Sequence, residues 1–393
     1  MEVRQGYKQT EVGIIPVDWE VCDLFEAADF LDGQRRPIKS SERAKFSGIY
    51  PYYGASGIID YVNEYIFDDD LILLGEDGEN ILSRNLPLAF QVKGKIWVNN
   101  HAHVLKPKAI FEIGFLTDYL ESLDYSLINS GTAQPKLNKQ ACLKIKVAKP
   151  TKTEQTAIAT ALSDADALIT SLEKLIEKKR AIKQGAMQQL LEPKQGWMIK
   201  ALGEVADILT GFPFPSNGYS KYGVRLLRGS NIKRGKTDWN EDICEYWPKI
   251  TSELQKYQLR SGDVVVAMDG SLVGKSFAQL SNIDIPSILL QRVARIRSTI
   301  VDINYLKELI CSTLFTAYCD SVKTASAIPH ISPADIYNFK INYPSEESEQ
   351  TRIASILSDM DKEIESLEQK LSKYKRLKQG MMQELLTGKI RLV

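Results

Sequence analysis

The sequence is poor in the features that stabilise secreted proteins or anchor membrane proteins. Its five cysteines are widely spaced and form no CxxC pair, so we expect reduced thiols, with neither a disulfide framework nor a zinc site. No apolar run approaches the roughly 18 residues that suggest a membrane span, and the first residues are polar. We therefore expect a cytoplasmic protein without a signal peptide.

The chain also lacks an excess of either charge and the sequence signatures of several enzymes. Its 50 basic and 50 acidic residues cancel, so DNA binding would depend on local patches or on a basic partner. We find no GxGxxG after a predicted strand, no Gly-x-Ser-x-Gly, no HExxH, and no Asn/Asp-Pro-Pro-aromatic motif. These absences argue against a catalytic site in this chain.

What the sequence does contain is an internal repeat. Residues 154–191 return as 349–386 at a constant offset of 195, with 21 of 38 positions identical. Apolar residues in both copies follow the coiled-coil spacing of about 3.5 residues, which predicts two long helices that each need a partner. Ordinary amphipathic core helices are the alternative. The predicted seam residues are Ile158, Leu162, Ile169, Leu172, Ile176, Ile353, Leu357, Met360, Ile364, Leu367, Leu371 and Tyr374.

The repeat extends more weakly to the segment before each helix. The matched positions are Trp19 with Trp197, Gly33 with Gly211, Pro37 with Pro215, 100–105 with 291–296, and Pro135 with Pro329. Short β-branched or aliphatic runs at 61–74 and 263–267, and helical periods over 111–127 and 304–322, predict an α+β fold for both segments. The predicted order is a globular domain (1–150), a long helix (151–195), a second globular domain (196–344), and a second long helix with a tail (345–393).

The order of the repeat constrains how the two helices pair. If the helices pair with each other and both copies are treated alike, they run antiparallel about a pseudo-two-fold axis. Gly185 and Gly380 lie inside the predicted helices, where glycine costs about 1 kcal/mol relative to alanine. This suggests close approach by another segment, with a self-contained helix crossing as the alternative. The predicted partner-docking residues are Gly185, Met187, Leu190, Gly380, Met382 and Leu385.

Several motifs could carry chemistry, but each is incomplete. The stretch 270–276 has three residues between its glycines, whereas a phosphate-binding loop needs four, and no helix is predicted after it. His101 and His103 lie two apart in the strand-like stretch 97–105, so both would face one side. A metal pair would need a third ligand, and base reading is the other interpretation. Glu76 and Asp77 follow a predicted strand, with no consistent set of nuclease carboxylates around them.

The second domain has a basic segment that suits phosphate and base contacts. Arg225, Arg228 and Lys233 surround the small polar Ser230 and Asn231. A solvated basic loop is the alternative.

Taken together, the chain resembles the specificity subunits of type I restriction-modification systems over almost its whole length. The stretches that carry the resemblance are TEVGIIPVDWEV (10–21), YYGASGIIDYV (52–62), LLGEDG (73–78), WVNNHAHVL (97–105), SGTAQPKLN (130–138), QRVARI (291–296), and both EQ…LSDxDxxI…KQGxMQxLL helices. The duplicated helix motif is the most specific of these.

The resemblance implies a non-catalytic DNA-recognition subunit of a prokaryotic restriction system. Two target-recognition domains would each read half of a bipartite double-stranded DNA target. An antiparallel coiled coil would set the spacer and dock two methyltransferase subunits, and restriction subunits would join for cleavage. S-adenosylmethionine, ATP and magnesium would be used by those partners, and this chain would bind no metal. A stand-alone methyltransferase or nuclease with its own recognition domains is the alternative.

The residues expected to contact DNA lie at predicted strand ends and in the loops beside them. They are Tyr53, Ser56, Glu76, Asp77, Asn99, Asn100, His101 and His103 in the first domain, and Arg225, Arg228, Ser230, Asn231, Lys233, Asp269, Ser271, Lys275, Gln291 and Arg292 in the second.

Overall fold

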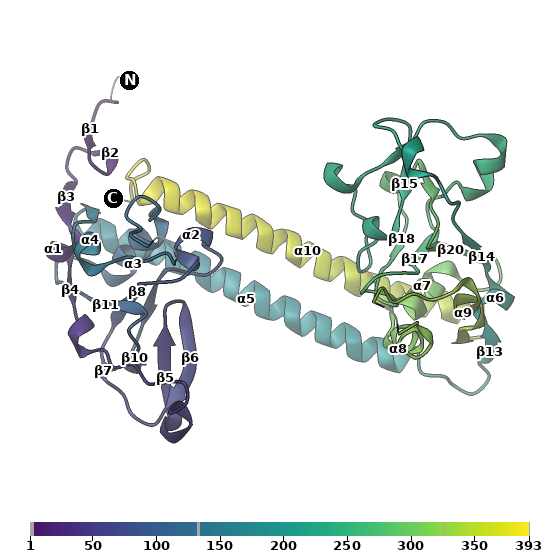
Figure 1. The fold of residues 1–393 in the computed structure, drawn as a ribbon, viewed down its shortest axis with the longest axis horizontal. Helices are drawn as coiled ribbons and strands as arrows, with labels where there is room; N and C mark the ends of the chain where they lie inside the picture. Colours follow the sequence, from purple (N-terminus) through teal and green to yellow (C-terminus); the bar gives the residue numbers. More distant parts are fainter. Residues whose placement is uncertain (1–3, 132–133, 326, 393) are drawn as a thin grey trace. The chain divides into compact units, whose positions relative to one another are not determined.

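The computed structural model describes residues 4–131, 134–325 and 327–392 (Figure 1). Thr132 and Ala133, within the stretch 130–138, lie outside the described residues. The chain forms two compact units: residues 1–174 with 368–393, and residues 175–367. Each unit contains one globular domain and part of each long helix, so the helices belong to both units.

The globular part of the first unit mixes short strands with short helices. A four-stranded sheet has the order β4-β11-β8-β9, and a second has the order β6-β5-β10-β7. The strands are β1 (Tyr7–Thr10), β2 (Gly13–Pro16), β3 (Glu20–Asp23), β4 (Ala28–Phe30), β5 (Ser47–Gly54), β6 (Gly57–Val62), β7 (Phe67–Asp68), β8 (Leu71–Gly75), β9 (Ala89–Val92), β10 (Lys95–Val98), β11 (Ala102–Pro107) and β12 (Lys146–Lys149). The helices are α1 (Leu24–Ala27), α2 (Asn80–Ser83), α3 (Ile113–Ser122) and α4 (Lys139–Leu143), with 3-10 turns η1 (Asp32–Gln34) and η2 (Arg43–Phe46).

The globular part of the second unit repeats this plan with different connections. Its sheets have the orders β14-β20-β17-β18, β16-β15-β19 and β13-β21. The strands are β13 (Met198–Ala201), β14 (Asp207–Thr210), β15 (Val224–Leu227), β16 (Tyr246–Trp247), β17 (Val264–Ala267), β18 (Phe277–Gln279), β19 (Ser287–Leu289), β20 (Val293–Arg297) and β21 (Lys340–Tyr343). The helices are α6 (Leu202–Val205), α7 (Ile303–Cys311), α8 (Thr313–Val322) and α9 (Pro333–Asn338), with 3-10 turns that include η4 (Gly229–Asn231).

The two long helices are α5 (Lys152–Leu190) and α10 (Glu347–Leu385). In the first unit Lys378 pairs with Asp166 at 2.6 Å, and Lys375 pairs with Glu173 at 2.6 Å. In the second unit the pairs are Lys183 with Asp361 and Lys179 with Glu363. Within each unit, the pair that lies further along α5 lies earlier along α10, so the helix segments run antiparallel. The predicted fold class, α+β domains joined by two long antiparallel helices, is confirmed.

The predicted seam residues are covered along both helices. Seven are buried and five are half-buried. The first two of each helix, Ile158 and Leu162 or Ile353 and Leu357, belong to the core of the adjoining globular domain. Each helix therefore begins as a core helix of its own domain and then pairs with the other long helix. The core-helix interpretation holds for the first part of each helix, and the coiled-coil interpretation holds for the rest.

Three local predictions differ from the structure. The stretch 97–105 is not one strand, because a turn at 99–101 separates β10 from β11; His101 and His103 therefore do not share a face. The helical period predicted over 304–322 is two helices, since Ser312 separates α7 from α8. The run 61–74 contains parts of three strands. Residues 277–279, where the sequence predicted no helix, form strand β18.

None of the helices in the described ranges combines the length and the apolar character that a membrane crossing would require.

Candidate nucleic-acid interface

The first domain brings three loops together where β8 ends. The N–H of Glu76 donates to His101 O at 2.8 Å, and that of Leu137 donates to Glu76 O at 2.7 Å. The N–H of Gly78 donates to Pro135 O at 3.0 Å. These bonds join the end of β8 to the β10–β11 turn on one side and to the loop before α4 on the other. The polar residues of the three loops therefore form one surface.

The second domain builds the same arrangement where β17 ends. The N–H of Met268 donates to Arg292 O at 2.8 Å, and that of Ile331 donates to Met268 O at 2.9 Å. The N–H of Gly270 donates to Pro329 O at 3.0 Å. The backbone pattern matches that of the first domain bond for bond, and the sequence match of Pro135 with Pro329 has a structural counterpart. The repeat thus extends to the loops that hold the predicted site residues.

Each of these surfaces carries a contact between an aspartate carboxylate and a neighbouring nitrogen-bearing side chain. Asp77 lies 2.9 Å from Nδ1 of His101, whose side chain is 50% exposed. At the equivalent position Asp269 lies 3.2 Å from Nη1 of Arg292, whose side chain is 65% exposed. The backbone geometry is shared and the exposed side chain differs, which suits two surfaces that recognise different base pairs.

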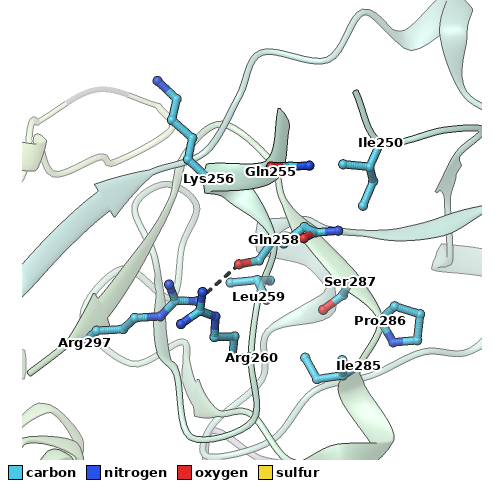
Figure 2. A pocket seen from close by; sticks show the side chains of 10 residues that line it. All are labelled: Ile250, Gln255, Lys256, Gln258, Leu259, Arg260, Ile285, Pro286, Ser287 and Arg297. Atoms are coloured by element: carbon cyan, nitrogen blue, oxygen red, sulfur yellow. Dashed lines mark hydrogen bonds between the residues drawn. The ribbon is translucent and has the colours of Figure 1, made fainter. Parts of the chain in front are cut away.

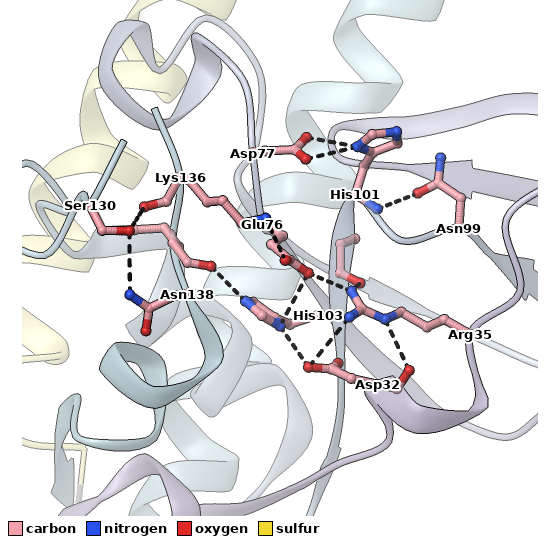
Figure 3. A network of polar contacts seen from close by, with 12 residues as sticks. Asp32, Arg35, Glu76, Asp77, Asn99, His101, His103, Ser130, Lys136 and Asn138 are labelled. Atoms are coloured by element: carbon pink, nitrogen blue, oxygen red, sulfur yellow. Dashed lines mark hydrogen bonds and ion pairs between the residues drawn. The ribbon is translucent and has the colours of Figure 1, made fainter. Parts of the chain in front are cut away.

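Beneath the first surface lies a cluster of ionic side chains, drawn in Figure 3. Nδ1 of His103 lies 2.8 Å from Asp32, and Arg35 donates to Glu76 at 2.7 Å. The Nζ of Lys136 lies 3.3 Å from Glu76. The cluster links η1, the end of β8, β11 and the loop before α4. It thus fixes the loops that carry the exposed residues.

His103 is the buried centre of this ionic cluster, with a side chain only 1% exposed. Burial by itself would lower the pKa of His103, but hydrogen bonds to Asp32 and Cys142 and the negative charge of Asp32 raise it to about 10. The ring is therefore protonated at neutral pH. Its other nitrogen, Nε2, donates to the carbonyl of Leu137 at 2.9 Å.

In the described part of the second domain, two positions equivalent to members of the ionic cluster hold apolar side chains. Met268 stands where the first domain has Glu76, and Ala294 stands where it has His103. Both residues belong to an apolar core cluster that includes Val266 and Ile296. The same loops are therefore supported by charge in one domain and by apolar packing in the other.

The residues predicted to contact DNA differ in their exposure. Exposed ones are Asn100, His101, Ser230, Ser271, Lys275, Gln291 and Arg292; half-buried ones are Tyr53, Ser56, Glu76, Asp77, Arg225, Arg228, Lys233 and Asp269; buried ones are Asn99, His103 and Asn231. The amide of Asn231 donates to Asp238 O at 3.0 Å, and Oδ1 of Asn99 accepts from the N–H of His101 at 2.8 Å. In this structure Asn99, His103 and Asn231 are buried and hold the turns by hydrogen bonds within the protein. Base contact stays a prediction for the exposed and half-buried residues.

The basic segment of the second domain is partly used for internal contacts. Arg225 lies over the ring of Trp239, 4.5 Å from its centroid, and donates to Ile283 O at 2.7 Å. Lys233 donates to Ser230 O at 2.8 Å. Arg228 also donates to a backbone carbonyl, that of Ile243, so the three basic side chains named for this segment all make contacts within the domain.

The helix ends expose residues other than those predicted for docking. Met187 and Leu385 are buried in the two domain cores, and Leu190 and Met382 are half-buried. The exposed apolar side chains are Ile182 (47%) and Leu377 (52%), which occupy equivalent positions at the offset of 195. Apart from the neighbouring residues and the nearby backbone of the same helix, a Cβ placed on Gly185 or Gly380 would meet no described atom within 4 Å. The close approach inferred from these glycines is therefore not made by the described part of this chain.

A pocket of about 230 Å³ lies in the second domain near the end of β20 (Figure 2). The guanidinium of Arg297 is bound there to Asp263 and to the carbonyl of Gln258. Its positive charge is thus neutralised within the protein. Across the described ranges, no group of three or more His, Cys, Asp or Glu side chains is arranged to hold a metal ion.

Sequence reasoning missed several residues that build the site. Asp32, Arg35 and Lys136 were not singled out, and neither was His330, whose backbone bridges to Asp269. The sequence marks three of these residues by their position alone. Asp32 precedes the repeated Gly33, and Lys136 and His330 follow the matched prolines. Isolated polar residues in loops have no period, so their partners emerge only when the chain is folded.

Comparisons of the sequence and of the structure with known proteins relate this chain to one protein family. The family described as "Type I restriction modification DNA specificity domain" matches residues 16–184 and again 194–376. A relative from Methanocaldococcus jannaschii, the type I restriction enzyme MjaVIII specificity subunit, is 28% identical over 99% of this chain and 96% of its own. The crystal structure of a type I restriction-modification S subunit from M. genitalium has a TM-score of 0.66 at 13% identity, covering 98% of both chains. A structure from a study of complex assembly and conformational transition of the type I system has a TM-score of 0.53, covering 96% of this chain and 99% of that one.

Proposed function

The chain belongs to the type I restriction-modification DNA specificity family, and from this premise we propose that each of its domains reads one half of a bipartite double-stranded DNA target. Its role in such a system is recognition of the DNA sequence. The observation that carries the proposal is the duplicated strand-end surface. The backbone bonds at Glu76 and Met268 are equivalent, while the exposed side chains beside them, His101 and Arg292, differ. Shared geometry with different hydrogen-bonding groups suits two readers of two different half-sites.

The long helices have two proposed roles in addition to joining the domains. Because α5 is continuous from Lys152 to Leu190 and spans parts of both units, it would set the unread spacer between the half-sites. The helix ends would dock two methyltransferase subunits. Pockets of about 480 Å³ and 670 Å³ at the equivalent C-terminal ends of α5 and α10 support two like docking sites, lined by Met187 and Leu191 in one and by Met382 and Leu386 in the other.

The chemistry of the system is assigned to partner subunits. S-adenosylmethionine would be used by the methyltransferase subunits, and ATP and magnesium by the restriction subunits. The alternative, a stand-alone methyltransferase or nuclease, has no observation in its favour. Incubation of the purified chain with S-adenosylmethionine, magnesium and DNA would separate the two, because only the alternative expects methyl transfer or cleavage.

Exchange of residues 196–343 for the second domain of another family member tests independent reading. We expect sequencing of the methylated sites in cells with the hybrid to show a change in one half-site only, because the first domain keeps its surface. The matched hybrid exchanges residues 1–150 and should change the other half-site. A change in both half-sites from either exchange would contradict the proposal.

A further inference from the structure

The turn before β20 holds Arg292 in a backbone conformation that arginine rarely adopts. Its φ angle is +65°, and Arg84 is the other non-glycine residue with a positive φ among the described residues. A residue with a Cβ is unfavourable there, and glycine would relieve the strain. An arginine found at such a position is a candidate for a functional role.

The guanidinium of Arg292 is held by one carboxylate and is otherwise open. Oδ2 of Asp269 accepts from Nη1 at 3.2 Å, and no other polar partner of the arginine side chain occurs in the described part of the chain. The Nε–Nη2 edge therefore keeps two parallel N–H donors that point away from the aspartate.

The backbone of Asp269 is held by a bridge to His330, and its Oδ1 lies so close to Gly229 that a Cβ added there would come within 3.3 Å of it. The aspartate can therefore orient the arginine before DNA arrives. A phosphate contact needs only a positive charge on a flexible stem, whereas a held guanidinium with a free two-donor edge fits a planar pair of acceptors.

We propose that Arg292 reads a guanine in the half-site of the second domain, with the N7 and O6 of that base accepting from the free edge, and that Asp269 is its positioning residue. This inference rests on the proposed function, since it assigns one base pair to a surface already proposed to read DNA. The equivalent His101–Asp77 pair has different donors, so the first half-site need not contain guanine at the matching place.

The test compares R292A, R292Q and R292G with the unchanged chain, each assembled with its methyltransferase subunits and offered a randomised double-stranded DNA library. We expect R292A to reduce guanine preference at one base pair by roughly tenfold to a hundredfold. R292Q should move that preference toward adenine, which glutamine pairs with. R292G should lose the preference as well, while melting no lower than the unchanged chain because the strain is relieved. Asp269→Asn should reduce the guanine preference less than R292A does.

The control is H101A, which should leave the second half-site unchanged. The inference would be overturned if R292A weakened binding to all sequences equally with a smaller salt dependence, since that is the behaviour of a phosphate contact. It would also be overturned if the second half-site were unchanged in every variant. Absence of any sequence preference in the unchanged complex would instead contradict the proposed function, so the two failures are distinguishable.

Discussion

At the scale of single residues, the ionic cluster of the first domain, with His103 buried at its centre, shows how one reading surface is stabilised. His103 lies between carboxylates and has a pKa raised from 6.5 to about 10, against the effect of its burial. In the unfolded chain the pKa returns to its ordinary value. Protonated His103 therefore contributes its full stabilisation below about pH 6.5, and this contribution is lost as the pH rises through about 10.

His103→Gln tests this linkage. The variant leaves Asp32 without its buried cationic partner, so we expect it to lower the free energy of unfolding by about 3 kcal/mol near pH 6. The difference from the unchanged chain should shrink as the pH approaches 10. Chemical denaturation at a series of pH values would measure it, with hydrogen exchange in β11 as a local probe. His101→Gln, which changes an exposed ring, is the control; a difference that did not vary with pH would contradict the assignment.

At the scale of the secondary-structure elements, the long helices keep glycine where their own chain does not require it. Nothing in the described structure approaches the position of a Cβ at Gly185 or Gly380. Glycine inside a helix costs about 1 kcal/mol relative to alanine. A contact outside the described part of the chain would offset this cost, and the proposed contact is a docked subunit.

Gly185→Ala and Gly380→Ala separate folding from docking. Each should raise the free energy of unfolding of the isolated chain by about 1 kcal/mol, because the helix gains intrinsic propensity. The same changes should weaken methyltransferase binding, roughly tenfold per site, because the added methyl group would crowd a partner backbone packed there. Calorimetric melting and titration would measure the two effects. Lys178→Ala, at an exposed position of α5, serves as the control. If the glycine variants were more stable but bound the methyltransferase subunits as tightly as the unchanged chain, the glycines would have no role in docking.

At the scale of the whole molecule, the end of the chain completes the first unit. Arg391 donates to Asp18 at 2.8 Å and to Glu154, a carboxylate that is fully buried and also accepts from Nε1 of Trp19 at 2.9 Å. Tyr7 donates to Gly388 O at 3.0 Å. In the second unit Lys194 lies 3.8 Å from Glu349, the counterpart of Glu154. Residue 391 thus pairs with the start of α5 in the first unit. Residue 194, in the linker between α5 and β13, pairs with the start of α10 in the second unit.

Arg391→Ala should therefore destabilise the first unit. Loss of the arginine leaves the charge of Glu154 buried without a cation, and we expect a reduction of about 2 to 3 kcal/mol in the free energy of unfolding. Lys194→Ala, which removes a longer and more exposed pair, should cost about 0 to 1 kcal/mol. Thermal melting with hydrogen exchange in residues 7–19 would compare them. An equal loss of unfolding free energy in the two variants would contradict the stabilising role inferred for Arg391.

The repeated order of domain and helix could be predicted from the sequence, because apolar spacing and a constant offset are preserved in each copy of the repeat. The sequence also located the strand ends where the site lies and identified Asp269 and Arg292 as candidates. Only the tertiary structure decided which polar residues face outward: His101 and His103 are two positions apart, yet a turn exposes one and buries the other. The partners of buried charges come from distant loops, and a linear pattern carries no information about such pairs.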